Sequence, residues 1–167
     1  MEIALIPQGV RIKTKQAQFL VDPVDAKAKN PVEATLLLDG NGPLLFPDYG
    51  VVLSGPGEYE VRGTKITGMR FDNTLFYDGS FDGVQTLITK TSSLAKAKDL
   101  KEFDVAIFQA DDTCDQAAII ALNPKVVIFH GPKAKECAAL LGKEPQKTNK
   151  FVSTKDKLPE ELTVIVF

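Results

Sequence analysis

The first half of the chain alternates short apolar stretches with turn residues, a pattern that is typical of β-strands. The stretches Glu2–Ile6, Val10–Thr14 and Ala17–Asp22 are separated by only a few residues, which predicts a meander of hairpin-connected strands. The next run, Ala34–Leu38, suits a strand that is buried on both faces. Further short strands are expected at Val51–Leu53, Glu58–Val61, Thr64–Thr67, Thr74–Tyr77 and Val84–Thr89. Their close, regular spacing predicts two packed sheets.

The second half of the chain mixes strands with helices. Val105–Gln109 and Val126–Phe129 are apolar strands, and the segment Cys114–Leu122 between them has a helical composition. Thr113 is followed three residues later by Gln116, which resembles a capping box at the start of that helix. The strand–helix–strand order predicts a right-handed parallel crossover. A second helix should lie between Pro132 and Gly142, and a third in 94–103. The chain therefore belongs to the α+β class, with mixed sheets and late helices.

Composition limits the range of functions. The chain has 167 residues, of which 44% are hydrophobic and 25% charged, and its net charge is −2. This length predicts one domain over 1–167. The acidic balance disfavours nucleic acid as a partner, because nucleic-acid affinity rests on lysine and arginine at phosphates. No apolar run approaches the roughly 20 residues that cross a bilayer, and the N-terminus lacks a secretory pattern. We therefore expect no membrane association and a cytoplasmic location.

Three segments together resemble the metallo-β-lactamase superfamily, and within it the small bacterial branch of zinc-dependent hydrolases. They are the N-terminal meander that ends in Val21-Asp22-Pro23, the run Val51-Val52-Leu53-Ser54-Gly55-Pro56-Gly57-Glu58-Tyr59-Glu60-Val61, and the run from Phe103 through Asn123-Pro124 to Ile128. The resemblance implies a four-layer αββα sandwich, here in a shortened form. It also implies a functional site at the strand ends between the two sheets.

The metal-binding signature of that superfamily, His-x-His-x-Asp-His, is missing. After the strand Ala34–Leu38 the chain continues Asp39-Gly40-Asn41-Gly42-Pro43-Leu44-Leu45-Phe46, without a histidine. The strand that should precede the bridging aspartate of the family ends in Lys90 and contains no acid. The single histidine, His130, lies one residue before the position where the resemblance expects one, and such an offset turns a strand side chain to the other face.

A catalytic zinc ion needs three protein ligands and an open position for water. One histidine cannot supply the usual set, and Cys114 and Cys137 have no close Cys-x-x-Cys spacing to replace it. We therefore expect no bound metal, no cofactor and no catalytic residue of the usual kind. Cys114 is interpreted as a small, half-buried residue and Cys137 as part of the core.

Four residues are candidates for the former metal cleft: Asp22, Asp39, Asp111 and His130. The three carboxylates could hold Mg²⁺ or Ca²⁺ through oxygen ligands, although acids at strand ends more often form turns and helix caps. His130 could act as a base or a ligand, but a histidine bonded to backbone at a strand end is the preferred interpretation.

Two hypotheses about function follow. The preferred one is a non-enzymatic binding, interaction or scaffold module on a degenerate sandwich, with a protein partner or a second copy of the chain. The apolar run Leu44, Leu45 and Phe46 would be its contact patch, unless it fills the vacated cleft. The alternative is a metal-dependent hydrolase with an atypical site of carboxylates and His130.

Overall fold

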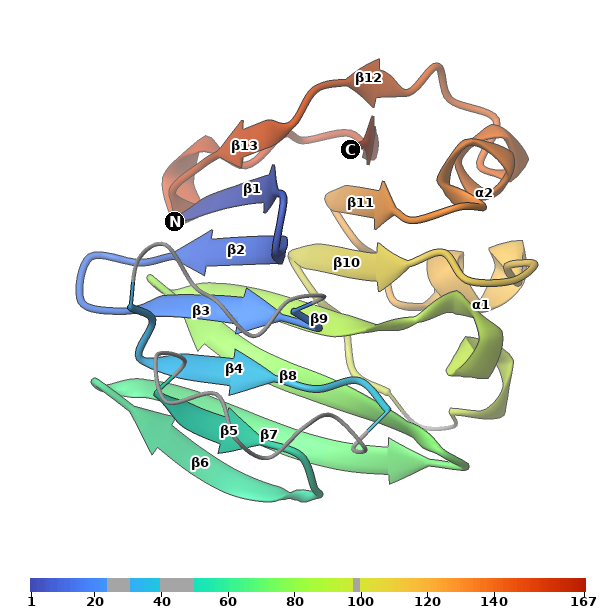
Figure 1. The fold of residues 1–167 in the computed structure, drawn as a ribbon. Coiled ribbons are helices and arrows are strands. Elements are labelled where there is room, and N and C mark those ends of the chain that lie inside the picture. Colours follow the sequence, from blue (N-terminus) through green and yellow to red (C-terminus); the bar gives the residue numbers. More distant parts are fainter. Residues whose placement is uncertain (24–30, 40–49, 98–99) are drawn as a thin grey trace.

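Two β-sheets packed face to face form the centre of the computed structural model, which describes residues 1–23, 31–39, 50–97 and 100–167 (Figure 1). The smaller sheet has six strands in the order β13-β1-β2-β3-β4-β5. Their bounds are β1 Glu2–Ile6, β2 Gly9–Lys13, β3 Gln18–Val21, β4 Ala34–Leu36, β5 Val51–Leu53 and β13 Lys150–Val152. The predicted N-terminal meander is confirmed, because β1, β2 and β3 pair antiparallel. The strands β3 and β4 then run parallel and end at the same edge.

The larger sheet has eight strands in the order β12-β14-β11-β10-β9-β8-β7-β6. Their bounds are β6 Gly57–Val61, β7 Thr64–Phe71, β8 Thr74–Phe81, β9 Val84–Lys90, β10 Val105–Gln109, β11 Val126–His130, β12 Gln146–Lys147 and β14 Thr163–Val166. The strands β6 to β9 form an antiparallel meander, whereas β9, β10, β11 and β14 are parallel neighbours. The predicted parallel crossover between β10 and β11 is confirmed.

The space between the sheets holds the main core. Alternate residues of each strand point into it, as the period of a β-strand requires. The smaller sheet contributes Phe19 and the larger sheet Phe81, whose rings meet edge to face at 5.1 Å between centroids. Burial of these apolar side chains is the main force that holds the two sheets together.

A second core lies between the larger sheet and the helices. The helices are α1 Gln116–Ala121, α2 Ala134–Leu140, and the short 3₁₀ helices η1 Thr91–Lys96 and η2 Lys155–Lys157. Ile119 of α1 and Ala138 of α2 are buried against residues of the sheet such as Phe108 and Phe129. The expected α+β sandwich is thus confirmed. In the described part of the chain both α-helices cover the larger sheet, so this part supplies three of the four expected layers.

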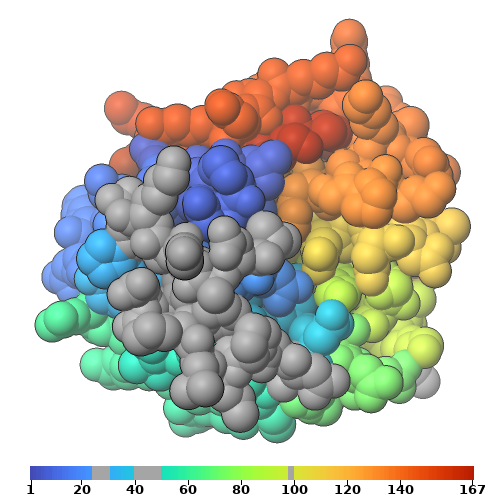
Figure 2. Space-filling model, viewed as in Figure 1, coloured from blue at the N-terminus to red at the C-terminus, as the bar shows by residue number. Residues whose placement is uncertain are grey.

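A late strand, β13, forms one edge of the smaller sheet beside the N-terminal strand β1, whereas the last strand, β14, lies in the larger sheet. β13 pairs antiparallel with β1, and the space-filling view shows the C-terminal segment directly beside the N-terminal strands (Figure 2). This pairing carries the chain from the larger sheet back to the smaller one. Within the described ranges, no helix is both long and apolar enough to span a membrane.

Local helix signals were less accurate than the strand pattern. The helix expected at Cys114–Leu122 is shorter, Gln116–Ala121, and its cap is Asp115, whose carboxylate accepts a hydrogen bond from the Ala118 amide. The predicted Thr113–Gln116 capping box is therefore wrong. The helix predicted in 94–103 is the 3₁₀ turn η1 at Thr91–Lys96. Gly142 does follow the end of α2, with a positive φ of 66°.

Candidate ligand site at the carboxyl edge of the strands

Three polar residues form a row across the end of the larger sheet. Lys90, Gln109 and His130 are register partners on the parallel strands β9, β10 and β11. Each continues the alternation of residues that face the smaller sheet, because Ile88, Ile107 and Ile128, two positions earlier, belong to the inter-sheet core. Adjacent strands lie about 4.8 Å apart, so the row spans about 10 Å from Lys90 to His130.

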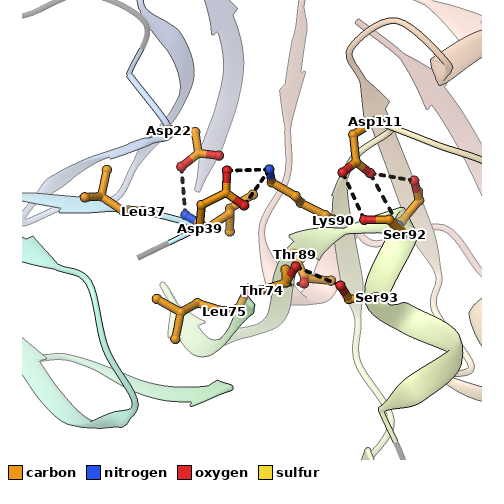
Figure 3. Close-up of polar contacts among 12 residues, drawn as sticks. Asp22, Leu37, Asp39, Thr74, Leu75, Thr89, Lys90, Ser92, Ser93 and Asp111 are labelled. Atoms are coloured by element: carbon orange, nitrogen blue, oxygen red, sulfur yellow. Dashed lines mark hydrogen bonds and ion pairs between the residues drawn. The ribbon is translucent and has the colours of Figure 1, made fainter. Parts of the chain in front are cut away.

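The Lys90 end of this row meets two acids of the smaller sheet. The Lys90 ammonium lies 2.7 Å from each carboxylate oxygen of Asp39. Asp22, at the end of β3, is close enough that the Lys90 charge acts on its carboxyl group. Figure 3 shows the three side chains together between the sheets. We call Asp22, Asp39 and Lys90 the Lys90 cluster.

Asp22 is held in place by the backbone of the neighbouring strand. Its Oδ1 accepts a hydrogen bond of 2.7 Å from the Leu38 amide, and its own φ of 41° is in the left-handed region, which aspartate tolerates better than most residues. Burial raises the pKa of Asp22 to about 6, because an ionised carboxylate loses its hydration there. The Leu38 amide and Lys90 act in the opposite direction, and Asp39 adds to the rise.

Buried hydrogen bonds connect the base of the cluster to the larger sheet. The Leu75 amide of β8 donates to the Leu38 carbonyl at 2.6 Å. The hydroxyl of Tyr77, also on β8, lies 2.6 Å from the Leu53 carbonyl and 3.1 Å from the Leu37 carbonyl. Burial raises the pKa of Tyr77, so the hydroxyl stays protonated and donates. These bonds fix the segment that leads into Asp39.

Asp111, another candidate for the cleft, does not join the Lys90 cluster and lies at the start of η1. Its carboxylate accepts hydrogen bonds from the Ser92 hydroxyl at 2.9 Å and from the Ser92 amide and Thr91 hydroxyl at 3.3 Å. It thereby caps the start of η1, and Figure 3 shows it on the far side of Lys90 from the two other acids.

His130 faces the smaller sheet, so the side-chain direction inferred from its one-residue offset is wrong. It is 8% exposed. Its Nε2 is buried and has no hydrogen-bond partner among the described residues, and the same holds for Oε1 of the adjacent Gln109. Within this part of the chain Nε2 does not make the predicted bond to backbone. Burial lowers the pKa of His130 to about 4, which keeps the imidazole neutral at physiological pH.

The donor set of this edge does not fit a zinc ion. The described residues contain no group of three histidine, cysteine or acidic side chains that could hold a metal. Asp39 forms an ion pair with the Lys90 ammonium. Asp22 accepts a hydrogen bond from the Leu38 amide, and Asp111 bonds to Ser92, away from the other two acids. His130 is two strands from Lys90, beyond the reach of a shared ion at ligand distances near 2 Å.

Sequence reasoning did not identify Lys90 or Gln109 as site residues. Both could have been found from alternation alone, because each is a polar residue in a position that continues a buried apolar face. The predicted contact patch Leu44, Leu45 and Phe46 lies outside the described residues.

Comparison with known proteins supports the architecture. No protein-family model matches the chain, and no curated protein does. Among solved structures, a candidate Zn-dependent hydrolase of the metallo-β-lactamase superfamily from Thermotoga maritima superposes with a TM-score of 0.77 at 18% identity, over 99% of this chain and 98% of that one. A candidate metal-dependent hydrolase from Parabacteroides distasonis superposes with a TM-score of 0.61 at 16% identity, over 97% of this chain and 91% of that one. The chain thus has the fold of the metallo-β-lactamase superfamily.

Proposed function

We propose that this protein is a binding module in which a lysine has replaced the metal of a metallo-β-lactamase sandwich. The observation that carries the proposal is the ion pair between Lys90 and Asp39 at the carboxyl edge between the sheets. The Lys90 side chain is only 13% exposed, so its charge is poorly screened. A divalent cation that entered between Asp22 and Asp39 would meet a positive charge already in contact with one of its ligands.

The module would bind a protein, either another chain or a second copy of this one. Leu44, Leu45 and Phe46 are the proposed contact, because they form an apolar run where the metal motif of the family would lie. A measurement of solution mass over a range of protein concentrations tests self-association. A mass that stays monomeric throughout excludes the second copy and leaves a different protein as the partner.

The replacement of the metal by Lys90 is tested by metal analysis of the tag-free protein, followed by melting curves with Zn²⁺, Mn²⁺ and Mg²⁺. We expect no stoichiometric metal and no ion-dependent rise in melting temperature. Lys90→Asp should place the missing acid beside Asp22 and Asp39. The melting temperature of this variant should therefore rise when Mn²⁺ or Zn²⁺ is added. Lys101→Asp, which changes a lysine in an ion pair with Asp78, controls for the change in net charge. Equal responses of the two variants would oppose the proposal.

The second candidate is a metal-dependent hydrolase with an atypical site, favoured by the names of both similar structures. It requires that the unmodified protein binds an ion through Asp22 and Asp39. Stoichiometric metal in the wild type, lost in Asp39→Asn, would establish this candidate and would exclude the lysine replacement.

A further inference from the structure

The two cysteines meet behind the larger sheet, although they are 23 positions apart in the sequence. Cys137, on α2, is 1% exposed, and Cys114 packs against the same core from the segment that joins β10 to α1. The Cys137 thiol donates to the carbonyl of Asp112 at 3.7 Å, two residues before Cys114. The Cys114 thiol lies close enough to the Cys137 thiol to raise its pKa.

The segment that carries Cys114 is already tied to the start of α2. The Lys133 amide donates to the Ala110 carbonyl at 2.9 Å, and the Ala110 amide donates to the His130 carbonyl at 2.7 Å. The Thr91 hydroxyl adds a bond of 3.2 Å to the Asp112 carbonyl. These contacts hold the backbone on both sides of the thiol pair, so a cross-link would join elements that are already adjacent.

The two thiols differ in access. Cys114 is partly exposed and Cys137 is buried, so a soluble oxidant reaches Cys114 first. Both cysteines are free in the structure. We propose that Cys114 and Cys137 form a redox pair that closes a reversible disulfide on reaction with a small-molecule disulfide, with Cys114 as the attacking thiol and Cys137 as the resolving thiol.

The chemistry balances in two exchange steps. The Cys114 thiol loses its proton, and its sulfur attacks one sulfur of the small disulfide, which forms a mixed disulfide and releases the first small thiol. The Cys137 sulfur, after losing its own proton, then attacks the Cys114 sulfur and releases the second small thiol. The protein is oxidised by two electrons, and the reagent is reduced to two thiols.

The second step should be slow and should depend on pH. Burial, together with the Cys114 thiol, raises the pKa of Cys137 to about 12. Because the thiolate is the nucleophile, the rate of disulfide closure should rise about tenfold per pH unit below that value.

Treatment of the native, tag-free protein with oxidised glutathione, followed by intact-mass measurement and non-reducing peptide mapping, tests the pair. The wild type should lose two hydrogen atoms and yield one peptide pair joined through Cys114 and Cys137. Cys137→Ala should instead accumulate a stable glutathione adduct on Cys114, and Cys114→Ala should stay unmodified.

Three results would overturn the proposal: an adduct on Cys114 of the wild type that does not convert to the intramolecular disulfide when the pH is raised, a disulfide between two copies of the chain, or no reaction at Cys114. If Cys137→Ala does not fold, the wild-type peptide map and the pH dependence of closure decide the question without it.

Discussion

The Lys90 ammonium contacts both carboxylate oxygens of Asp39 at 2.7 Å, which joins β9 of the larger sheet to the segment that follows β4 in the smaller one. Asp39 itself is 59% exposed, so this pair contributes little to stability. Its importance is positional. It places the Lys90 ammonium beside Asp22, whose buried carboxyl group has a raised pKa.

The first prediction concerns Asp22→Asn. The folded pKa of Asp22 is about 6 and its ordinary value is 3.8. The folded state therefore binds this proton more tightly, so the contribution of Asp22 to stability is full below pH 3.8 and is lost as pH rises through 6. The loss is on the order of 3 kcal/mol. Asparagine keeps an oxygen for the Leu38 amide and tolerates the positive φ.

Urea unfolding of wild type and Asp22→Asn at intervals from pH 4 to pH 8 measures this effect. The variant should gain stability over the wild type as pH rises to about 7 and should match it near pH 4. A stability difference that does not change with pH would show that the Asp22 carboxyl group titrates normally.

The second prediction concerns His130→Gln and has the opposite sign. The folded pKa of His130 is about 4, and its ordinary value is 6.5. The unfolded state binds this proton more tightly, so the contribution of the neutral imidazole is full above pH 6.5 and is lost as pH falls through 4. The loss is on the order of 3 kcal/mol. Glutamine has no titrating group in this range, so the variant should lose this acid-induced destabilisation.

The two effects should largely cancel in the wild type between pH 4 and pH 6. Asp22→Asn should therefore become less stable on acidification, His130→Gln more stable, and the double variant nearly independent of pH over this range. The same unfolding series measures all four proteins. Parallel slopes for the two single variants would contradict the opposite signs of the two pKa shifts.

The third prediction concerns Tyr77→Phe, which removes a buried hydroxyl and keeps the ring. The loss leaves the Leu37 carbonyl without this donor, whereas the Leu53 carbonyl keeps the hydrogen bond of 3.0 Å that the Leu37 amide donates. An unsatisfied buried acceptor costs about 1–3 kcal/mol. Tyr59→Phe is the matched control, because its hydroxyl donates to the Gly55 carbonyl at 2.8 Å in a less buried place. Equal losses of unfolding free energy in the two variants would refute the bridging role of Tyr77.

The sequence pattern predicted the parts of the site that depend on strand register. Asp22 and Asp39 both follow strands that end at the same edge, and the structure brings them together. Alternation alone would also have placed Lys90 and His130 on the inter-sheet face. The metal motif of the superfamily gives no reason to single out a lysine at this strand end, and a one-residue offset from that motif does not fix the face of His130, which the strand alternation does.

Residues beyond a strand end are less predictable, because register no longer fixes their direction. Asp111 is two positions past Gln109, and its carboxylate turns to the free amide and hydroxyl groups at the start of η1. An acid in such a position more readily accepts hydrogen bonds from nearby backbone and hydroxyl groups than from partners in a distant cleft. The choice between such local partners depends on how the helices pack on the sheet, which a single sequence does not show.

The fourth prediction separates the observed cap of α1 from the one expected from the sequence. The Asp115 carboxylate accepts a bond of 3.1 Å from the Ala118 amide, whereas Thr113 only donates its own amide to Asp112. Asp115→Ala should therefore cost about 1 kcal/mol of unfolding free energy. Thr113→Ala should cost little, because the Thr113 side chain makes no hydrogen bond among the described residues. Urea unfolding of the two variants beside the wild type decides between the caps: a larger loss for Thr113→Ala would restore the capping box, and would mean that α1 begins earlier than Gln116.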